Sequence, residues 1–150
     1  MDKEVLAYVA GLFDGEGSIT IGKSNPATYN TLRSPSHWLQ VGITNTNKNL
    51  IDWLCNTFGG HISNNSHCPS RKKQRPCWAW RKNSNEAAFF LKSIFPFSKI
   101  KQEQMKLAIE FQEKRKGSKG NKGCLTQQVI QERDDYKQKI SKLALGYRTI

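Results

Sequence analysis

The spacing of apolar residues predicts five helices. Apolar side chains recur at intervals of three and four positions, which places them on one face of a helix. Asp2 is expected to cap the first helix and Ser98 the fourth, whereas Gly59-Gly60 and Pro96 are expected to end the second and third. The predicted helices span residues 3–14, 49–58, 86–95, 98–116 and 125–145.

Alternation of apolar and polar residues predicts four strands, over residues 18–22, 37–46, 61–66 and 77–82. The resulting order, α-β-β-α-β-β-α with trailing helices, predicts an α+β fold with one antiparallel sheet and helices on one face. Such a sheet can leave its other face to solvent or lay it in a DNA groove. The polar alternates expected on that open face are Thr20, Gln40, Thr44, Ser63, Asn65 and Arg81.

The chain of 150 residues has the length of one compact domain. We assign residues 1–116 to its core. A Gly/Lys/Ser linker follows at residues 117–123, before the polar final helix. Residues 117–150 are therefore expected to be a linker and a helix that pack on the same domain or extend it.

Positive charge is concentrated in the middle of the chain, and the net charge is +12. Between residues 17 and 85 the only acid is Asp52, and residues 70–75 form a basic tip between the last two predicted strands. Such a surface attracts polyanions and favours nucleic acid as the partner, although ribosomal and membrane-surface proteins share this composition. The bases in this stretch are Lys23, Arg33, Lys48, Arg71, Lys72, Lys73, Arg75, Arg81 and Lys82.

Several sequence features favour an intracellular protein. The sequence holds no run of about 18 apolar residues, and its N-terminus lacks the basic-then-apolar plan of a signal peptide. The four cysteines are too scattered to indicate a disulfide framework. A zinc site from His61, His67, Cys68 and Cys77 stays an alternative, but their spacing matches no standard finger.

Small residues form a stripe on the first predicted helix. Ala7, Gly11 and Gly15 are four positions apart and share one face. Gly11 inside a helix costs about 1 kcal/mol relative to alanine, so a compensating close helix–helix contact is expected. Glycine at the end of the helix could serve instead as a C-terminal cap, but this does not explain Gly11.

Acidic residues at the end of the same helix are electrostatically misplaced. Asp14 and Glu16 lie where a helix favours cations, and a bound cation would relieve this. Mg²⁺ prefers carboxylate, carbonyl and water oxygens, and the Gly15 carbonyl has no side chain shielding it. A solvated acidic turn is the other interpretation of these residues.

The segment Val9-Ala10-Gly11-Leu12-Phe13-Asp14-Gly15-Glu16-Gly17 resembles the nine-residue signature of the LAGLIDADG homing endonucleases. It departs from that signature at Val9 for Leu, Phe13 for Ile, Gly15 for Ala and Glu16 for Asp. The last change keeps the carboxylate and lengthens its reach by one methylene. The resemblance covers about residues 5–115 and includes segments 18–21, 43–46, 58–60, 78–81 and 97–102.

The resemblance implies an αββαββα fold whose sheet saddles the DNA major groove. Family members with one motif act as homodimers, and this sequence holds one motif. The implied dimer interface is Ala7, Gly11 and Gly15, which brings the two Glu16 carboxylates together near the symmetry axis. Glu16 and the Gly15 carbonyl are the implied metal ligands for phosphodiester hydrolysis with Mg²⁺. Mn²⁺ is expected to substitute, and Ca²⁺ to support binding without cleavage.

Further site residues follow from the matching segments. Asn45 falls where the family places a polar residue that orients water, and Lys48 and Lys101 fall where it keeps basic residues near the phosphate; ordinary solvent exposure is the alternative for each. For Lys101, a nearby phosphate would also offset the unfavourable dipole at a helix start. The expected DNA-contacting residues are Ser24, Arg33, Trp38, Gln40, Thr44, Ser63, Asn65, Lys72, Lys73, Arg75, Ala79 and Arg81.

The leading expectation is a metal-dependent endonuclease that cuts a long, roughly palindromic site in double-stranded DNA. An intron RNA maturase and a non-cleaving DNA-binding regulator of the same fold are the alternatives. Only the maturase would take RNA as its partner, and Glu16 argues against the regulator because DNA binding alone needs no carboxylate facing phosphates. The expected setting is bacterial or phage cytoplasm, or an organelle, and no membrane is involved.

Overall fold

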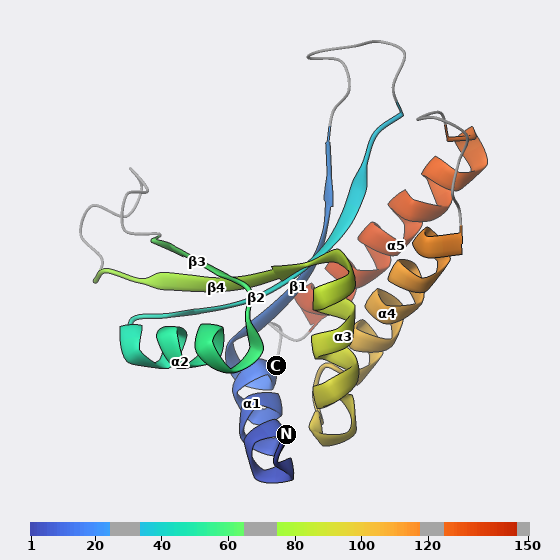
Figure 1. Ribbon diagram of the computed structural model, residues 1–150. Coiled ribbons are helices and arrows are strands. Elements are labelled where there is room, and N and C mark those ends of the chain that lie inside the picture. The colour runs from blue at the N-terminus through green and yellow to red at the C-terminus, as the bar shows by residue number, and fades with distance from the viewer. Residues whose placement is uncertain (25–33, 65–74, 118–124, 147–150) are drawn as a thin grey trace.

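The computed structural model describes residues 1–24, 34–64, 75–117 and 125–146 (Figure 1). One four-stranded sheet crosses the molecule, and the helices lie on one side of it. The elements in chain order are α1 (Lys3–Glu16), β1 (Gly17–Lys23), β2 (His37–Asn45), α2 (Lys48–Phe58), β3 (His61–Asn64), β4 (Trp78–Asn83), α3 (Ser84–Ile94), the 3₁₀ helix η3 (Phe95–Phe97), α4 (Gln102–Gly117) and α5 (Gln127–Gly146). This arrangement confirms the predicted α+β class and the αββαββα order.

The sheet consists of two hairpins joined through their second strands. Its order is β1-β2-β4-β3, and every neighbouring pair is antiparallel. The β2–β4 pairing runs from Gln40 to Asn45, so the first three residues of β2 pair only with β1. The far end of the β1–β2 hairpin therefore extends beyond the four-stranded sheet, as Figure 1 shows.

The hydrophobic core lies between the sheet and the helices. The alternation predicted for β2 is confirmed, since Leu39, Val41 and Ile43 are fully buried. Phe90 of α3 makes edge-on contacts with the rings of Trp80 and Phe13, at centroid distances of 5.0 and 5.6 Å. Burial of these apolar surfaces is the main source of stability for this layered arrangement.

Of the two predicted N-caps, Asp2 has the predicted position without the side-chain hydrogen bond, and Ser98 is wrong. Asp2 occupies the N-cap position of α1, but its side chain makes no capping hydrogen bond. Helix α4 begins at Gln102, and the Ser98 hydroxyl instead donates to Asp14 of α1 at 2.6 Å. Asn47, which was not predicted as a cap, accepts from the Leu50 amide at 3.2 Å and starts α2.

Helix α5 packs against α4 and against β1. Tyr136 of α5 donates its hydroxyl proton to Glu110 at 2.6 Å, and Gln104 of α4 donates to the Ile140 carbonyl at 3.1 Å. The assignment of residues 1–116 as the core stays a prediction. Among the helices in the described part of the chain, none has both the length and the apolar character of a membrane span.

Candidate nucleic-acid interface

The face of the sheet turned away from the helices is polar. The strand register places Thr20, Gln40 and Asn83 side by side on this open face, and the Gln40 amide donates to the Asn83 side-chain oxygen at 3.0 Å. Trp38 lies against Gly22, where an added Cβ would approach the indole to 2.2 Å. Glycine at this position therefore lets the indole lie flat on the sheet.

Most of the predicted DNA-contacting residues that the structure describes lie on or beside this open face. The register places there Trp38, Gln40, Thr44, Ser63, Ala79 and Arg81. Ser24 follows β1 and hydrogen-bonds with Ser36, and Arg75 is exposed just before β4. The remaining predicted contacts, Arg33, Asn65, Lys72 and Lys73, lie outside the described residues.

Ala79 corrects one of these predictions. It shares the open face by register, but only 1% of its surface is exposed, so its methyl group cannot reach a ligand in this conformation. Asn83 is a residue that the prediction missed. It continues the period-2 pattern of Ala79 and Arg81, and this pattern could have identified it.

The exposed acid of the first helix meets a side chain from the sheet. The Asn45 amide donates to Glu16 Oε2 at 2.6 Å, and the Asn47 backbone amide donates to Asn45 Oδ1 at 2.7 Å. The second bond fixes which end of the Asn45 carboxamide faces Glu16. Because Gly17 pairs with Ile43, the end of α1 and the end of β2 are held together by the sheet. The structure therefore brings two predicted site residues into contact.

Asp14 has a different role from Glu16. Its carboxylate accepts hydrogen bonds from the Ser98 hydroxyl at 2.6 Å and from the backbone amides of Lys99, Ile100 and Lys101 at 2.7, 3.2 and 3.3 Å. Burial raises the pKa of Asp14, but these donors lower it more, so the net shift is downward. The alternative of a solvated acidic turn therefore does not hold for Asp14, whose carboxylate is already satisfied by the turn that precedes α4.

Lys101 lies beside the last turn of α1. Its ammonium group donates to the Asp14 backbone carbonyl, one of the carbonyls that a helix end leaves unpaired. Burial lowers the pKa of Lys101, and the negative charge of Asp14 only partly opposes this. A phosphate is therefore not needed to explain a lysine at the start of α4, since the C-terminal end of α1 supplies a partner for its charge.

Lys48 is not brought to Glu16 by any contact seen in the structure. Its ammonium group pairs with Asp52 one turn later in α2, at 2.6 Å, and its side chain is 54% exposed. This pairing is the usual i, i+4 contact on a helix surface. Of the three residues carried over from the matching segments, Asn45 and Lys101 are thus held at the end of α1, whereas Lys48 is held within α2.

The oxygen donors at the end of α1 suit a hard divalent cation but do not complete a site. Glu16 is an exposed carboxylate, and Gly15 beside it is exposed and has no side chain to shield its backbone. Within the described ranges, no three His, Cys, Asp or Glu residues cluster as metal ligands. Two residues of the alternative zinc set, His67 and Cys68, lie outside those ranges.

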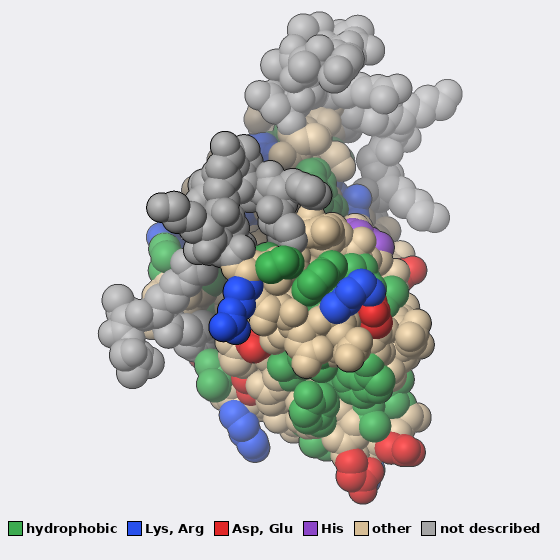
Figure 2. All heavy atoms as spheres, turned by 90° about the vertical axis from the view of Figure 1, so that its left-hand side faces the viewer, with side chains coloured by type: hydrophobic (Ala, Val, Ile, Leu, Met, Phe, Trp, Pro, Cys, Tyr) green, Lys and Arg blue, Asp and Glu red, His purple; other side chains and the backbone are tan. Residues whose placement is uncertain are grey.

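The small-residue stripe of α1 is exposed. Ala7, Gly11 and Gly15 all face solvent, and a Cβ added at either glycine would have no atom within 4 Å. Tyr8 beside them is 56% exposed. Figure 2 shows hydrophobic side chains gathered on the lower half of the side that carries α2, above acidic ones. Among the described residues, nothing makes the close contact expected at Gly11.

No protein-family model matches the chain, and no curated protein matches it. Several solved structures, however, match this chain. The homing endonuclease I-CvuI with a DNA target matches with a TM-score of 0.72 and 16% identity, over 94% of this chain and 82% of that chain. The archaeal intron-encoded I-Vdi141I complexed with DNA matches with a TM-score of 0.73 and 15% identity, over 95% and 86%.

A third match names the family. The LAGLIDADG homing endonuclease I-GzeII with its DNA target matches with a TM-score of 0.66 and 18% identity. This chain has the LAGLIDADG homing-endonuclease fold. The match covers 88% of this chain but 43% of I-GzeII, so the homing-endonuclease fold seen here corresponds to less than half of that larger chain.

Proposed function

We propose that this protein is a site-specific, metal-dependent endonuclease that cuts double-stranded DNA as a homodimer. The observation that carries the proposal is the exposed Glu16 carboxylate at the end of α1, oriented by Asn45 at the edge of the polar open face. This arrangement puts an exposed acid beside the polar open face of the sheet. The I-CvuI and I-Vdi141I structures are DNA complexes, which supports the same partner here.

The open face has the chemistry of a DNA-reading surface. Gln40 and Arg81 present side chains that can bond two atoms of one base edge, and Trp38 and Thr44 supply apolar and hydroxyl contacts. The excess of bases between residues 17 and 85 provides phosphate contacts. Affinity should therefore fall steeply with salt, as counterions compete for the phosphates.

The metal would be held by Glu16 and the Gly15 carbonyl, together with oxygens from DNA and water. A divalent cation there supplies an activated water and neutralises charge on the phosphate. Asn45 holds the Glu16 carboxylate in one orientation. We propose Mg²⁺ as the ion, with Mn²⁺ able to substitute and Ca²⁺ supporting binding alone; I-CvuI complexes were obtained with Mg and with Ca.

A homodimer follows from the incomplete donor set and the bare stripe on α1. One chain supplies a single carboxylate to the site, and two chains related by a two-fold axis would supply two. A shared cation would offset the repulsion between those carboxylates. The exposed Ala7, Gly11 and Gly15 would allow the two α1 helices to approach closely. The lower coverage of I-GzeII is consistent with a chain that works in pairs.

Cleavage of a large randomised duplex library tests this proposal. The protein is incubated with Mg²⁺, with Ca²⁺ and with EDTA, and the new DNA ends are sequenced. We expect discrete cuts in a roughly palindromic site of about 20 base pairs in Mg²⁺ only. A matched pair of variants separates chemistry from binding: Glu16→Gln should keep DNA affinity and lose cutting, whereas Glu103→Gln on the exposed start of α4 should cut normally.

Normal cutting by Glu16→Gln would refute the assignment of the metal site. Binding of duplex DNA without any cutting in Mg²⁺ or Mn²⁺ would refute the endonuclease. Intron RNA would then be the next ligand to test, because tight RNA binding that survives Glu16→Gln is the signature of a maturase.

A further inference from the structure

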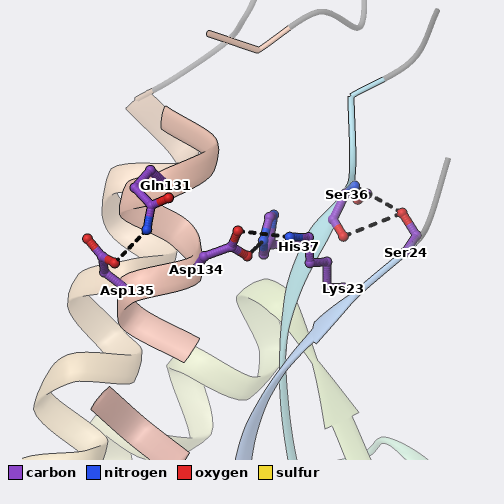
Figure 3. A network of polar contacts seen from close by, with 7 residues as sticks. All are labelled: Lys23, Ser24, Ser36, His37, Gln131, Asp134 and Asp135. Atoms are coloured by element: carbon purple, nitrogen blue, oxygen red, sulfur yellow. Dashed lines mark hydrogen bonds and ion pairs between the residues drawn. The ribbon is translucent and has the colours of Figure 1, made fainter. Parts of the chain in front are cut away.

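The final helix is tied to the far end of the β1–β2 hairpin (Figure 3). Asp134 of α5 spans both strands: its Oδ2 lies 2.8 Å from Lys23 Nζ, and its Oδ1 lies 2.8 Å from His37 Nε2. Lys23 and His37 are paired across the strands, so one carboxylate binds both members of this pair. A second tie lies just before α5, where the Leu125 amide donates to Ser34 Oγ at 2.6 Å.

The histidine of this network is completely buried. Burial lowers the pKa of His37, while hydrogen bonding to Asp134 opposes the shift. A neutral ring then donates its Nε2 proton to Asp134, and Nδ1 finds no hydrogen-bond partner among the described residues. Among the described residues, Asp134 is the hydrogen-bond partner of the imidazole. The position of the ring therefore depends on this carboxylate.

The hairpin end that Asp134 holds is paired with a neighbouring strand on one side of β2 only. Residues 37–39 of β2 pair with β1 and not with β4. An isolated two-stranded hairpin is only marginally stable, so contacts from outside the sheet decide its angle. Helix α5 provides those contacts from the helix side of the sheet.

The opposite side of the same hairpin end belongs to the open face. Successive side chains on a strand point to opposite faces, so Trp38 and Gly22 lie directly behind His37 and Lys23. Ser24 and Ser36 extend the pairing by one step, with the Ser24 amide 2.9 Å from the Ser36 carbonyl. Any tilt of the hairpin would therefore move Trp38 and Ser24 relative to a ligand on the open face.

The distance from the acidic site indicates which part of a DNA target this end would read. Strand β1 starts directly after Glu16 and ends at Lys23, so at about 3.3 Å per residue the two lie roughly 20 Å apart. Along B-DNA, roughly 20 Å corresponds to about six base pairs. The hairpin end would read outer base pairs, while Thr44 and Arg81 would read inner ones.

We propose that Asp134, through His37 and Lys23, is a positioning residue that sets the orientation of the hairpin and so determines specificity at the outer base pairs of each half-site. This inference rests on the proposed endonuclease function. It gives α5, in addition to its packing against α4 and β1, the role of holding a DNA-reading hairpin from the helix side of the sheet.

The test compares Asp134→Ala with Asp135→Ala in the full-length protein. Asp135 is the neighbouring acid on the same helix, but it accepts from Gln131 within α5 at 3.0 Å (Figure 3). Each variant cuts a library in which every base pair of the wild-type target is randomised in turn. For Asp134→Ala we expect tolerance of wrong bases to rise about fivefold near the sixth pair from the centre, with the inner pairs unchanged. Asp135→Ala should match the wild type.

An even change at all base pairs, or no change, would overturn the proposal. If Asp134→Ala fails to fold by circular dichroism, Lys23→Met replaces it, since this variant keeps the contact between His37 and Asp134. If the wild type cuts no duplex, the endonuclease proposal fails, and hydrogen exchange decides the positioning role separately. Faster amide exchange at residues 36–43 in Asp134→Ala than in Asp135→Ala supports that role, and equal rates refute it.

Discussion

The carboxylates of Asp14 and Glu16, which are separated by one residue, have different environments in this protein. Asp14 points back into the chain and is saturated by donors from residues 98–101, whereas Glu16 is exposed and meets Asn45. The difference arises from direction: positions 14 and 16 lie about 200° apart around a helix. One acid therefore fixes the junction of α1 with α4, and the other is left available for chemistry.

Asp14→Asn should destabilise the fold at neutral pH by about 2–3 kcal/mol, because an amide keeps one acceptor and turns its NH₂ group toward donors. The pKa of Asp14 is lowered in the folded state, so its stabilisation is present at neutral pH and is lost as pH falls below about 4. The difference in the free energy of unfolding between wild type and variant should therefore be smaller at acidic pH. Urea unfolding at pH 7 and pH 3 measures both effects.

Asp135→Asn serves as the control for this comparison. Its carboxylate accepts from Gln131 on an exposed helix surface, so we expect a change of no more than about 0.5 kcal/mol. Equal stability of Asp14→Asn and wild type at pH 7 would mean that the four donors do not hold α4 to α1.

At the scale of elements, the join between α2 and β3 depends on two glycines. Gly59 and Gly60 have φ angles of +71° and +97°, a region that other residues rarely adopt. A Cβ at Gly60 would lie 2.6 Å from the Arg81 carbonyl on β4. The turn therefore requires glycine for both its backbone angle and the close approach of the neighbouring strand.

Gly60→Ala should lower the free energy of unfolding by about 2–4 kcal/mol, because it adds backbone strain to a steric clash. Gly146→Ala is the matched control: a Cβ at the end of α5 would meet no atom within 4 Å, and little change is expected there. Thermal unfolding of both variants measures the difference. If the two variants melt together, the turn tolerates a side chain and the clash is relieved by movement of β4.

At the scale of the whole molecule, three surface features bear on the proposed homodimer. The open face of the sheet is polar, the acidic site at its edge is incomplete, and the nearby helix carries an exposed stripe with room for a close neighbour. In the part of the chain that the structure describes, no atom lies within 4 Å of a Cβ added at Gly11 or Gly15. The association of two chains is thus a requirement of the proposed chemistry.

Gly11→Leu should abolish dimerisation while leaving each chain folded, since the new side chain meets open space within the monomer. Sedimentation velocity measures the association, and circular dichroism checks the fold. Gln128→Leu adds the same side chain to an exposed position on α5 and should remain dimeric. A dimer that survives Gly11→Leu would show that another surface joins the chains.

The sequence by itself determined the order of elements and the faces of the sheet. The period-2 pattern that buries Leu39 and Val41 also places Gln40 on the open face, because alternation is a property of the strand backbone. The end of α2 at Gly59-Gly60 could also be predicted from the sequence, because a positive φ angle is a local property of the backbone that glycine tolerates. The first helix and the acid at its C-terminal end could likewise be predicted from the order of residues alone, because helical spacing is a local feature.

Only the tertiary structure decided how distant side chains are paired. Ser98 does not cap the start of α4 and instead contacts Asp14, 84 residues earlier, and His37 contacts Asp134, 97 residues later. Ala79 is buried although its face is open, and Lys101 has its partner inside the chain. Periodicity records which way a side chain points along its own element. The partner it meets depends on how elements pack, and no local pattern in the sequence carries that information.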